Sequence, residues 1–324
     1  MANPQHTPDP RLVWAIDLGG TNTKVGVVRQ DGEVLAQTSL RTRHERGGPS
    51  WAEETAAALE AIARESGAGA QAIHAVGIGS PGPLSVKQGV LTNPMPNLPG
   101  WQGFPICSVI TDLTGKPSYL DNDANCAALA EHWIGAGRDS DNLIVLTLGT
   151  GIGSGVIAEG RLLHGYTDNA GELGHLSINH RGARCACGNR GCIELYACAA
   201  AVTRRYRRNL RAAGTAPARA RITPKDVFDA ALSGDPAAQR TFEEIGTYLG
   251  MAIASMVHAF NPQMVVLAGG VAQSGELLLA PVRETVLEHI YPEHREGLQI
   301  RASELPEGAG LLGAARLAFL NLPG

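Results

Sequence analysis

Apolar runs separated by glycine-rich turns fill the first forty residues of the chain. The run "LVWAIDL" at 12–18 predicts a strand, and residues 25–28 predict a second strand after a turn with two adjacent glycines. Asp31-Gly32 is typical of a tight hairpin, and a third strand is expected from Val34 onward. The chain therefore opens with a hairpin that is extended by a third strand.

Further along, stretches with apolar residues at helical spacing alternate with apolar strands. Helices are expected at residues 51–66, 124–133, 197–210, 224–232, 237–260 and about 308–320. Strands are expected between them, in "AIHAVGIGS", "LIVLTL" and "QMVVLA". Because strands and helices alternate throughout, the sequence predicts an α/β fold.

The strand–turn–strand pattern of the first residues returns in "LIVLTLGTGIGSGVIAEGRLL". Leu18-Gly19 aligns with Leu148-Gly149, and Gly26-Val27 aligns with Gly155-Val156 after a deletion of one residue. This repeat predicts two copies of a hairpin-led α/β unit that face each other across a cleft. Each copy directs a turn rich in backbone N–H groups at the same ligand, and such turns bind anions.

Composition narrows the class of protein. The chain has 324 residues, 44% of them hydrophobic, which is enough for two domains with substantial cores. Its formal net charge of −4 argues against nucleic acid as a partner. The basic run 204–211 is an exception, which we interpret as a solvated helix face, with contact to a phosphate or a partner as the alternative.

Nothing in the sequence indicates a membrane or export. No 18 consecutive residues are apolar, and the first ten, "MANPQHTPDP", lack the apolar stretch of a secretory signal. We therefore expect a cytoplasmic protein whose cysteines are reduced.

Both glycine-rich turns are candidate phosphate loops. In "DLGGTNTK" a carboxylate ends a strand just before bare backbone N–H groups, so Asp17 is a candidate for holding Mg²⁺ and Lys24 for reaching a phosphate. "LGTGIGSG", from Gly149, has the same plan. Either turn alone is also compatible with a plain hairpin, whereas the pair favours one nucleotide held by two loops.

A third motif, "DNDANCAAL", lies where a strand meets a helix. Asp121, Asn122 and Asp123 are good helix-capping residues, which is the simplest interpretation. A carboxylate at this junction is also suited to accept a proton from a substrate hydroxyl that attacks phosphorus.

Near the C-terminus, Gly269-Gly270 ends a buried strand in "VVLAGGV". Such a pair lets a flat ring lie against the backbone, but close packing of a helix on the strand explains it equally well.

Three of the six cysteines lie close together in "GHLSINHRGARCACGNRGCIE". Cys185, Cys187 and Cys192 are spaced C-x-C-x4-C, and C-x-C pairs rarely form disulfides because the geometry is restrictive. Gly188 and Gly191 supply turns that fold the thiols around one point. Tetrahedral zinc takes four ligands, for which His175 is the best fourth and His180 the alternative. Buried unligated thiols and a redox pair are the other interpretations.

Two acidic residues flank this cluster. Glu172 lies three residues before His175, and Glu194 lies two residues after Cys192. Carboxylates accept several hydroxyl hydrogen bonds at once, so a metal-stabilised loop that carries them is suited to bind a polyol.

Taken together, these motifs and their order resemble the ROK family of sugar kinases, glucokinase-like branch. The resemblance spans nearly the whole chain and includes "SPGP" and "GELGH" besides the motifs above. It implies a two-domain actin-like ATPase fold. Residues 1–120 with a C-terminal helix at about 306–324 would form one domain with the first phosphate loop. Residues 121–305 would form the other, with the zinc site and the second loop.

The resemblance also implies roles for individual positions. Asp123 would be the catalytic base. The sugar would be contacted by Asn97, Asn122, Asp123, Glu172, His175 and Glu194. ATP would be bound through Asp17, Gly19, Gly20, Thr21 and Lys24, through Gly149, Thr150 and Gly151, and through Gly269 and Gly270 at the adenosine side. Structural Zn²⁺ would be held by His175, Cys185, Cys187 and Cys192.

The implied function is transfer of phosphate from ATP, with Mg²⁺, to the 6-hydroxyl of a hexose. Glucose is our first choice, and N-acetylmannosamine, N-acetylglucosamine and mannose are the alternatives. Polyphosphate is the alternative phosphate donor to ATP. Because members of the family are usually homo-dimers or homo-tetramers, the resemblance also implies such an assembly. A sugar-responsive repressor of the same family would carry a DNA-binding segment, for which little room precedes the first strand at about Leu12. An actin-like assembly ATPase would not need the metal and glutamate cluster.

Overall fold

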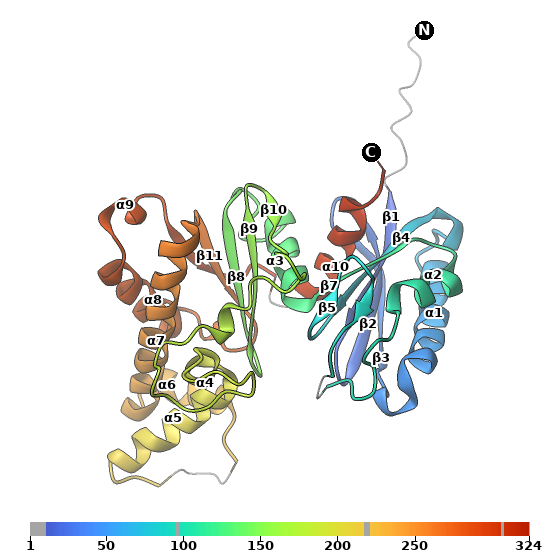
Figure 1. Cartoon of the computed structure of the whole chain (residues 1–324). Coiled ribbons are helices and arrows are strands. Elements are labelled where there is room, and N and C mark those ends of the chain that lie inside the picture. The colour runs from blue at the N-terminus through green and yellow to red at the C-terminus, as the bar shows by residue number, and fades with distance from the viewer. Residues whose placement is uncertain (1–10, 95–96, 217–220, 306–307, 324) are drawn as a thin grey trace. The chain divides into compact units, whose positions relative to one another are not determined.

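The computed structural model describes residues 11–94, 97–216, 221–305 and 308–323. The described residues form two compact units. Unit 1 takes its residues from Met1–Ala130, Tyr166–Asn169 and Gly308–Gly324, and unit 2 from Glu131–Gly165 and Ala170–Glu307. Each unit combines one five-stranded sheet with helices (Figure 1), which confirms the predicted α/β class. The domain limits predicted above stay a prediction.

The sheet of unit 1 has the strand order β3-β2-β1-β4-β7. Strands β1, β2 and β3 form an antiparallel meander, and β4 and β7 continue the sheet in parallel with β1. The bounds are β1 Leu12–Leu18, β2 Asn22–Arg29, β3 Val34–Arg41, β4 Ile73–Ser80 and β7 Ser118–Asn122. A separate small hairpin pairs β5 Leu84–Ser85 with β6 Val90–Leu91.

Helices cover this sheet with apolar side chains. The α-helices are α1 Gly47–Glu65, α2 Ile106–Thr114, the first part of α3 Asp123–Trp133, and α10 Ala309–Leu320, with 3₁₀ turns at His44–Arg46 and Ala70–Ala72. The core of the unit includes Trp14, Trp51 and Trp101, all fully buried. Helix α2 has no counterpart among the predicted elements, because its nine residues are too few for a clear helical period.

The sheet of unit 2 has the strand order β10-β9-β8-β11-β12. Again three strands form an antiparallel meander, while β11 and β12 continue the sheet in parallel with β8. The bounds are β8 Leu143–Leu148, β9 Ile152–Ala158, β10 Arg161–Leu162, β11 Met264–Ala268 and β12 Gln299–Ala302.

Six helices belong to the described part of unit 2 alone. They are α4 Glu194–Ala197, α5 Ala199–Ala212, α6 Pro224–Leu232, α7 Pro236–Phe260, α8 Glu276–His289 and α9 Pro292–Arg295, with 3₁₀ turns at Leu173–His175 and Ala272–Ser274. Helix α7 begins at a proline after the Asp235 cap and ends at Asn261, which adopts a left-handed conformation before Pro262. Buried residues of α7 contribute much of the core.

The strand pairing confirms the internal repeat read from the sequence. In unit 1, Gly26 pairs with Ala15, three residues before Leu18. In unit 2, Gly155 pairs with Val145, three residues before Leu148. The β1–β2 turn closes on the pair Leu18 and Thr23, while the β8–β9 turn closes on Leu148 and Ile152 and is one residue shorter. The one-residue deletion therefore falls in the turn, where it leaves the strand register intact.

Among the residues that the structure describes, no helix is both long enough and apolar enough to cross a lipid bilayer.

Candidate active site and metal centre

The first glycine-rich turn, between β1 and β2, places a half-buried acid beside exposed polar residues. Asp17 lies directly across from Lys24 in the antiparallel pair. Burial raises the pKa of Asp17, and the smaller effect of the Lys24 charge opposes this rise. Thr21 and Lys24 are exposed, and Gly19 closes the turn by donating its N–H to the Asn22 carbonyl at 3.0 Å.

Two glycines show what surrounds this turn. A Cβ at Gly20 would lie 2.9 Å from the Asn97 Cβ, so the structure brings the predicted sugar-bordering residue to the candidate phosphate loop. A Cβ at Gly310 would lie 2.8 Å from the carboxyl atoms of Asp17, so the first turn of α10 packs directly on this acid. Sequence reasoning missed Gly310, because it is almost 300 positions from Asp17.

The β7–α3 junction carries the three polar residues of the "DND" motif. Asp121 is fully buried, and its Oδ1 accepts hydrogen bonds from the Asn122 N–H and the Asn125 side-chain amide, both at 2.8 Å. Side-chain oxygens of Asn122 and Asp123 both accept from the Ala124 N–H, at 2.9 and 2.8 Å. The motif therefore caps α3 and also leaves the Asp123 side chain exposed at the junction.

Cys126, one turn into α3, shows that these acids lie near one another. Burial raises the pKa of the Cys126 thiol, and the negative charges of Asp121, Asp17 and Asp123 raise it further. The sheet register places these acids together, because Asp17 of β1 pairs with Gly79 of β4, and Gly79 pairs with Asp121 of β7, two residues before Asp123. A Cβ at Gly79 would lie 3.1 Å from the Cys126 Sγ. Unit 1 thus brings together the candidate magnesium ligand and the candidate base.

The second glycine-rich turn, in unit 2, is stabilised by a carboxylate. The Glu194 Oε2 accepts a hydrogen bond from the Ile152 N–H at 3.0 Å, and a Cβ at Gly151 would lie 2.3 Å from the same oxygen. The Gly149 N–H bonds the Gly151 carbonyl at 2.9 Å across the turn. We expected Glu194 to contact sugar, and the structure adds a contact with the phosphate turn that the sequence did not indicate.

Helix α5 begins against the same turn. The Ala199 N–H donates to the Gly149 carbonyl at 2.9 Å, and Cys198 just before it is extended. The single helix predicted at 197–210 is therefore wrong in one respect, because Cys198 separates α4 from α5.

Gly269 and Gly270 differ in their surroundings. Gly269 has a left-handed φ of 85°, and its Cβ would lie 2.7 Å from the Leu148 carbonyl oxygen, so this glycine serves close packing. Nothing lies within 4 Å of a Cβ at Gly270. Gly270 instead lines a mainly apolar pocket of about 210 Å³, together with Val202, Pro224, Lys225, Phe228, Phe242, Val271, Gln273 and Ser274. The packing interpretation thus applies to Gly269, while a flat ring lying against Gly270 stays a prediction.

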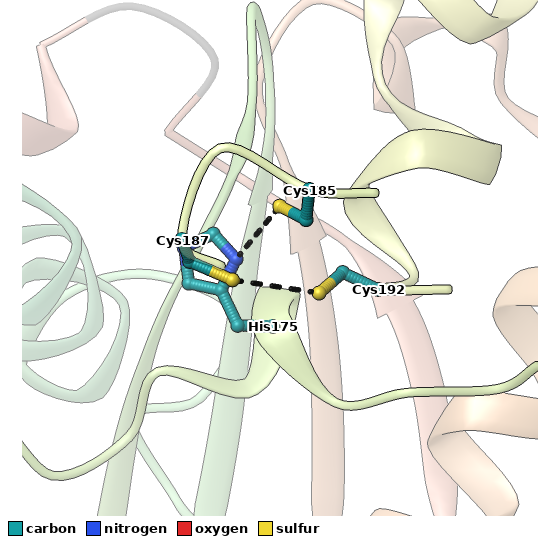
Figure 2. A group of neighbouring side chains, drawn as sticks. All are labelled: His175, Cys185, Cys187 and Cys192. Carbon is teal, nitrogen blue, oxygen red and sulfur yellow. Dashed lines mark hydrogen bonds between the residues drawn. The ribbon is translucent and has the colours of Figure 1, made fainter. Parts of the chain in front are cut away.

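The cysteine cluster forms one compact set of donors (Figure 2). His175 Nδ1 lies 3.7 Å from Cys185 Sγ, and Cys187 Sγ lies 3.7 Å from Cys192 Sγ. The four ligand atoms all lie within 4.8 Å of one another. The described chain contains no other such group of three or more His, Cys, Asp and Glu residues, and His180 is not part of this one.

These distances suit a tetrahedral metal ion. Ligands about 2.3 Å from a central zinc stand about 3.8 Å apart in a tetrahedron. Burial and the neighbouring thiols raise the pKa of Cys192 to about 12, while a hydrogen bond from the Asn189 backbone lowers that of Cys187. The positive φ values of Gly188 and Gly191 confirm the predicted turns. The donor set is compatible with zinc.

His175 offers its two ring nitrogens to different neighbours. While Nδ1 points to Cys185, Nε2 lies 4.0 Å from the Glu172 carboxylate, whose side chain is 57% exposed. This arrangement leaves Glu172 and the outer edge of the imidazole available to a polar ligand.

Comparison with known proteins agrees with these features. Residues 13–320 match the ROK family. A glucokinase from Thermotoga maritima is 38% identical over 319 residues, covering 96% of this chain and 98% of that protein.

Two solved structures have the same architecture. The ROK hexokinase from Thermus thermophilus aligns with a TM-score of 0.79 at 38% identity, covering 95% of this chain and 98% of that one. A ROK family glucokinase from Streptomyces griseus, solved with glucose and AMPPNP, aligns with a TM-score of 0.78 at 31% identity, covering 96% of this chain and 100% of that one. The chain has the two-domain actin-like ATPase fold of these sugar kinases, and it belongs to the ROK family.

Proposed function

We propose that this protein is an ATP-dependent hexose kinase that phosphorylates the 6-hydroxyl of glucose. The observation that carries the proposal is the placement of Asp17 and Asp123 at the carboxyl ends of two parallel strands of one sheet, in a chain of the ROK family. Full-length similarity to the glucokinases of Thermotoga maritima and Streptomyces griseus supports glucose as the substrate.

In the proposed reaction, Asp123 accepts the proton of the 6-hydroxyl as its oxygen attacks the γ-phosphorus of ATP. The bond from that phosphorus to the bridging oxygen breaks, and ADP leaves with the bond's electron pair. Asp123 is exposed at the N-terminus of α3, where its Oδ1 accepts a hydrogen bond from the Ala124 N–H. Proton transfer by a positioned carboxylate is typical of phosphoryl transfer to hydroxyls.

The remaining nucleotide contacts follow from the two turns. In this proposal Gly20 and Thr21 of unit 1 and Thr150 and Gly151 of unit 2 would present backbone N–H groups to the phosphates, and Lys24 would add a positive charge. Gly19 and Gly149 would shape the turns, because their N–H groups bond the Asn22 and Gly151 carbonyls. Asp17 is the residue that would hold Mg²⁺, which neutralises the charge of the phosphates when bound. The pocket beside Gly270 has the apolar walls and the size to accept the adenine ring.

The sugar would be bound by Asn97, Asn122, Glu172, His175 and Glu194 in addition to Asp123. In this proposal the zinc has a structural role, since His175, Cys185, Cys187 and Cys192 already occupy all four tetrahedral positions. It orients the His175 ring so that Nε2 faces the sugar side with Glu172.

The variant Asp123→Asn tests the mechanism. It keeps an oxygen that can cap α3 but cannot accept the proton, so kcat should fall by about 100-fold or more while hexose binding is retained. Asp112→Asn, an exposed change on α2, is the matched control and should behave as wild type. A wild-type kcat for Asp123→Asn excludes Asp123 as the base.

A coupled kinase assay over hexoses and donors tests the substrate. We expect the highest kcat/KM with glucose among the sugars, ahead of mannose, N-acetylglucosamine and N-acetylmannosamine. Among the donors we expect it with ATP, ahead of polyphosphate.

We also propose that the protein is a homo-dimer or homo-tetramer in the cytoplasm, where thiols stay reduced. Size-exclusion chromatography with light scattering measures the oligomeric state.

A further inference from the structure

Positive charge is concentrated in one part of unit 2. Residues 199–244 contain nine Lys and Arg against five Asp and Glu, whereas the rest of the chain contains 18 against 26. Helix α5 alone carries five arginines and no acid. A chain with a net charge of −4 therefore has a strongly basic segment, and the basic run noted in the sequence is its centre.

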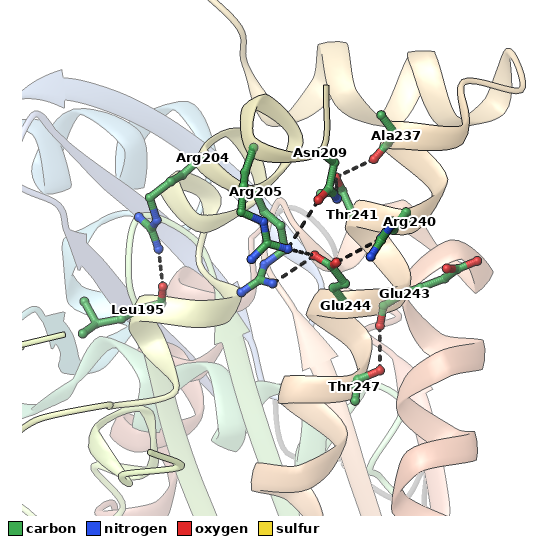
Figure 3. Close-up of polar contacts among 11 residues, drawn as sticks. Leu195, Arg204, Arg205, Asn209, Ala237, Arg240, Thr241, Glu243, Glu244 and Thr247 are labelled. Atoms are coloured by element: carbon green, nitrogen blue, oxygen red, sulfur yellow. Dashed lines mark hydrogen bonds and ion pairs between the residues drawn. The ribbon is translucent and has the colours of Figure 1, made fainter. Parts of the chain in front are cut away.

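Glu244 on α7 is the focus of this charge (Figure 3). Its Oε2 lies 3.0 Å from Arg205 Nη1 and 2.5 Å from Arg208 Nη2, and its Oε1 lies 3.2 Å from Arg240 Nε. Three guanidinium groups thus surround one carboxylate, which neutralises only one of their charges. Burial by itself would raise the pKa of Glu244, but these arginines outweigh it and lower that pKa, so the carboxylate stays ionised.

The Tyr248 ring and the low exposure of Arg205 fix one side of this arginine cluster. The Arg205 side chain is only 11% exposed, and its guanidinium lies 4.6 Å from the centre of the Tyr248 ring. Arg208 and Arg240, by contrast, are 58% and 68% exposed. A nearly buried cation therefore lies beside two exposed ones, and each exposed guanidinium has N–H donors beyond those that bond Glu244.

Three of the other four acids of the segment have partners outside the arginine cluster. Asp226 caps α6 with Thr223, and Asp229 bonds Lys225. Asp235 caps α7 and accepts a hydrogen bond from the Tyr206 hydroxyl at 2.6 Å. Glu243 is exposed, next to Glu244 along the chain. The three arginines around Glu244 therefore carry about two positive charges more than Glu244 neutralises.

We propose that Arg205, Arg208 and Arg240, positioned by Glu244, form a binding site for a phosphate group. A tetrahedral dianion matches both the excess charge and the forked donors of two neighbouring guanidinium groups, which bind phosphate in a bidentate manner. The ligand is inorganic phosphate or the phosphate group of a small phosphate ester. This site is separate from the glycine-rich turns proposed to bind ATP.

Isothermal titration with inorganic phosphate at constant ionic strength tests the site. The double variant Arg208→Gln, Arg240→Gln changes only exposed side chains, and it should weaken phosphate binding by about tenfold or more because two charge-assisted contacts are lost. The matched control is Arg221→Gln, Arg301→Gln, which removes the same charge from exposed positions outside α5 and α7. The control should stay within about twofold of wild type.

Phosphate bound at the ATP turns contributes equally to all three proteins, so the difference between the double variants reports this site alone. Equal affinities in all three proteins for both inorganic phosphate and glucose 6-phosphate, or equal losses in both double variants, would overturn the proposal. Parallel titrations with glucose 6-phosphate and glucose identify the source of the ligand. If both phosphates bind and glucose does not compete, the phosphate group suffices; if only the ester binds, the site takes a phosphate monoester.

Discussion

The carboxylate of Glu194 accepts a hydrogen bond from the main-chain N–H of Ile152 at 3.0 Å. This contact joins the end of the cysteine-rich segment to the turn between β8 and β9, both within unit 2. A residue expected to bind sugar thus also supports a turn proposed to bind phosphate.

Removal of this carboxylate should therefore affect both substrates. Loss of a hydrogen bond to a charged group costs about 1.5–3 kcal/mol, so Glu194→Ala should lower kcat/KM for ATP as well as for hexose by about 10- to 100-fold. Glu172→Ala is the matched comparison, because Glu172 lies beside His175, and it should affect the hexose alone. An unchanged KM for ATP in Glu194→Ala would contradict a role in the turn.

Asp17→Asn should stabilise the protein at neutral pH while it lowers activity. Burial raises the folded-state pKa of Asp17. Between the ordinary pKa of an aspartate and this raised value, the folded protein keeps a proton that the unfolded chain has released. The stability contributed by this group is complete below the ordinary pKa of an aspartate and is lost as pH rises through the raised folded-state pKa. An uncharged amide avoids that loss.

Urea unfolding between pH 4 and pH 8 measures the effect. The stability of Asp17→Asn relative to wild type should increase with pH, whereas the exposed control Asp112→Asn should show no such trend. If the difference in free energy of unfolding between Asp17→Asn and wild type does not change with pH, the pKa of Asp17 is not raised in the folded protein.

The adjacent glycines 269 and 270 should respond differently to substitution. Gly269→Ala places a Cβ 2.7 Å from the Leu148 carbonyl at a left-handed φ, so it should lower the free energy of unfolding by about 1–3 kcal/mol. Gly270→Val meets nothing within 4 Å of its Cβ, but it projects into the pocket of about 210 Å³. It should raise KM for ATP with little change in Tm, as thermal unfolding and kinetics together will show. A normal KM for ATP would exclude this pocket as the adenine site.

Cys187→Ser should remove the metal. Wild-type protein should contain about one equivalent of zinc, and the variant close to none, because a tetrahedral site loses most of its affinity with one thiolate. We expect a lower Tm and a higher KM for hexose with it. Cys107→Ser, a half-buried cysteine outside the cluster, is the control and should keep its zinc. Active wild-type protein without zinc in elemental analysis would refute the assignment.

The sequence predicted those features that depend on residues close together in the chain. Strand β1 and helix α6 have the predicted bounds, because an apolar run and a proline-started helix are local signals. The internal repeat was also recognisable, since the register of a hairpin is specified by its own strands and turn. The C-x-C-x4-C spacing likewise places three thiols within reach of one ion wherever the loop lies.

Tertiary structure decided the features that combine distant segments. His175, rather than His180, joins the thiols because a bridge pairs Ser177 with Cys192 and returns the chain beside the cluster. The pocket at Gly270 includes Val202 and Phe228 from helices 40 or more positions away. Arg205 and Arg208 meet Glu244 only where α5 packs on α7. A pattern along the chain specifies which face of each element is buried. Which faces then meet depends on how all the elements pack together, and that information is not local to any segment.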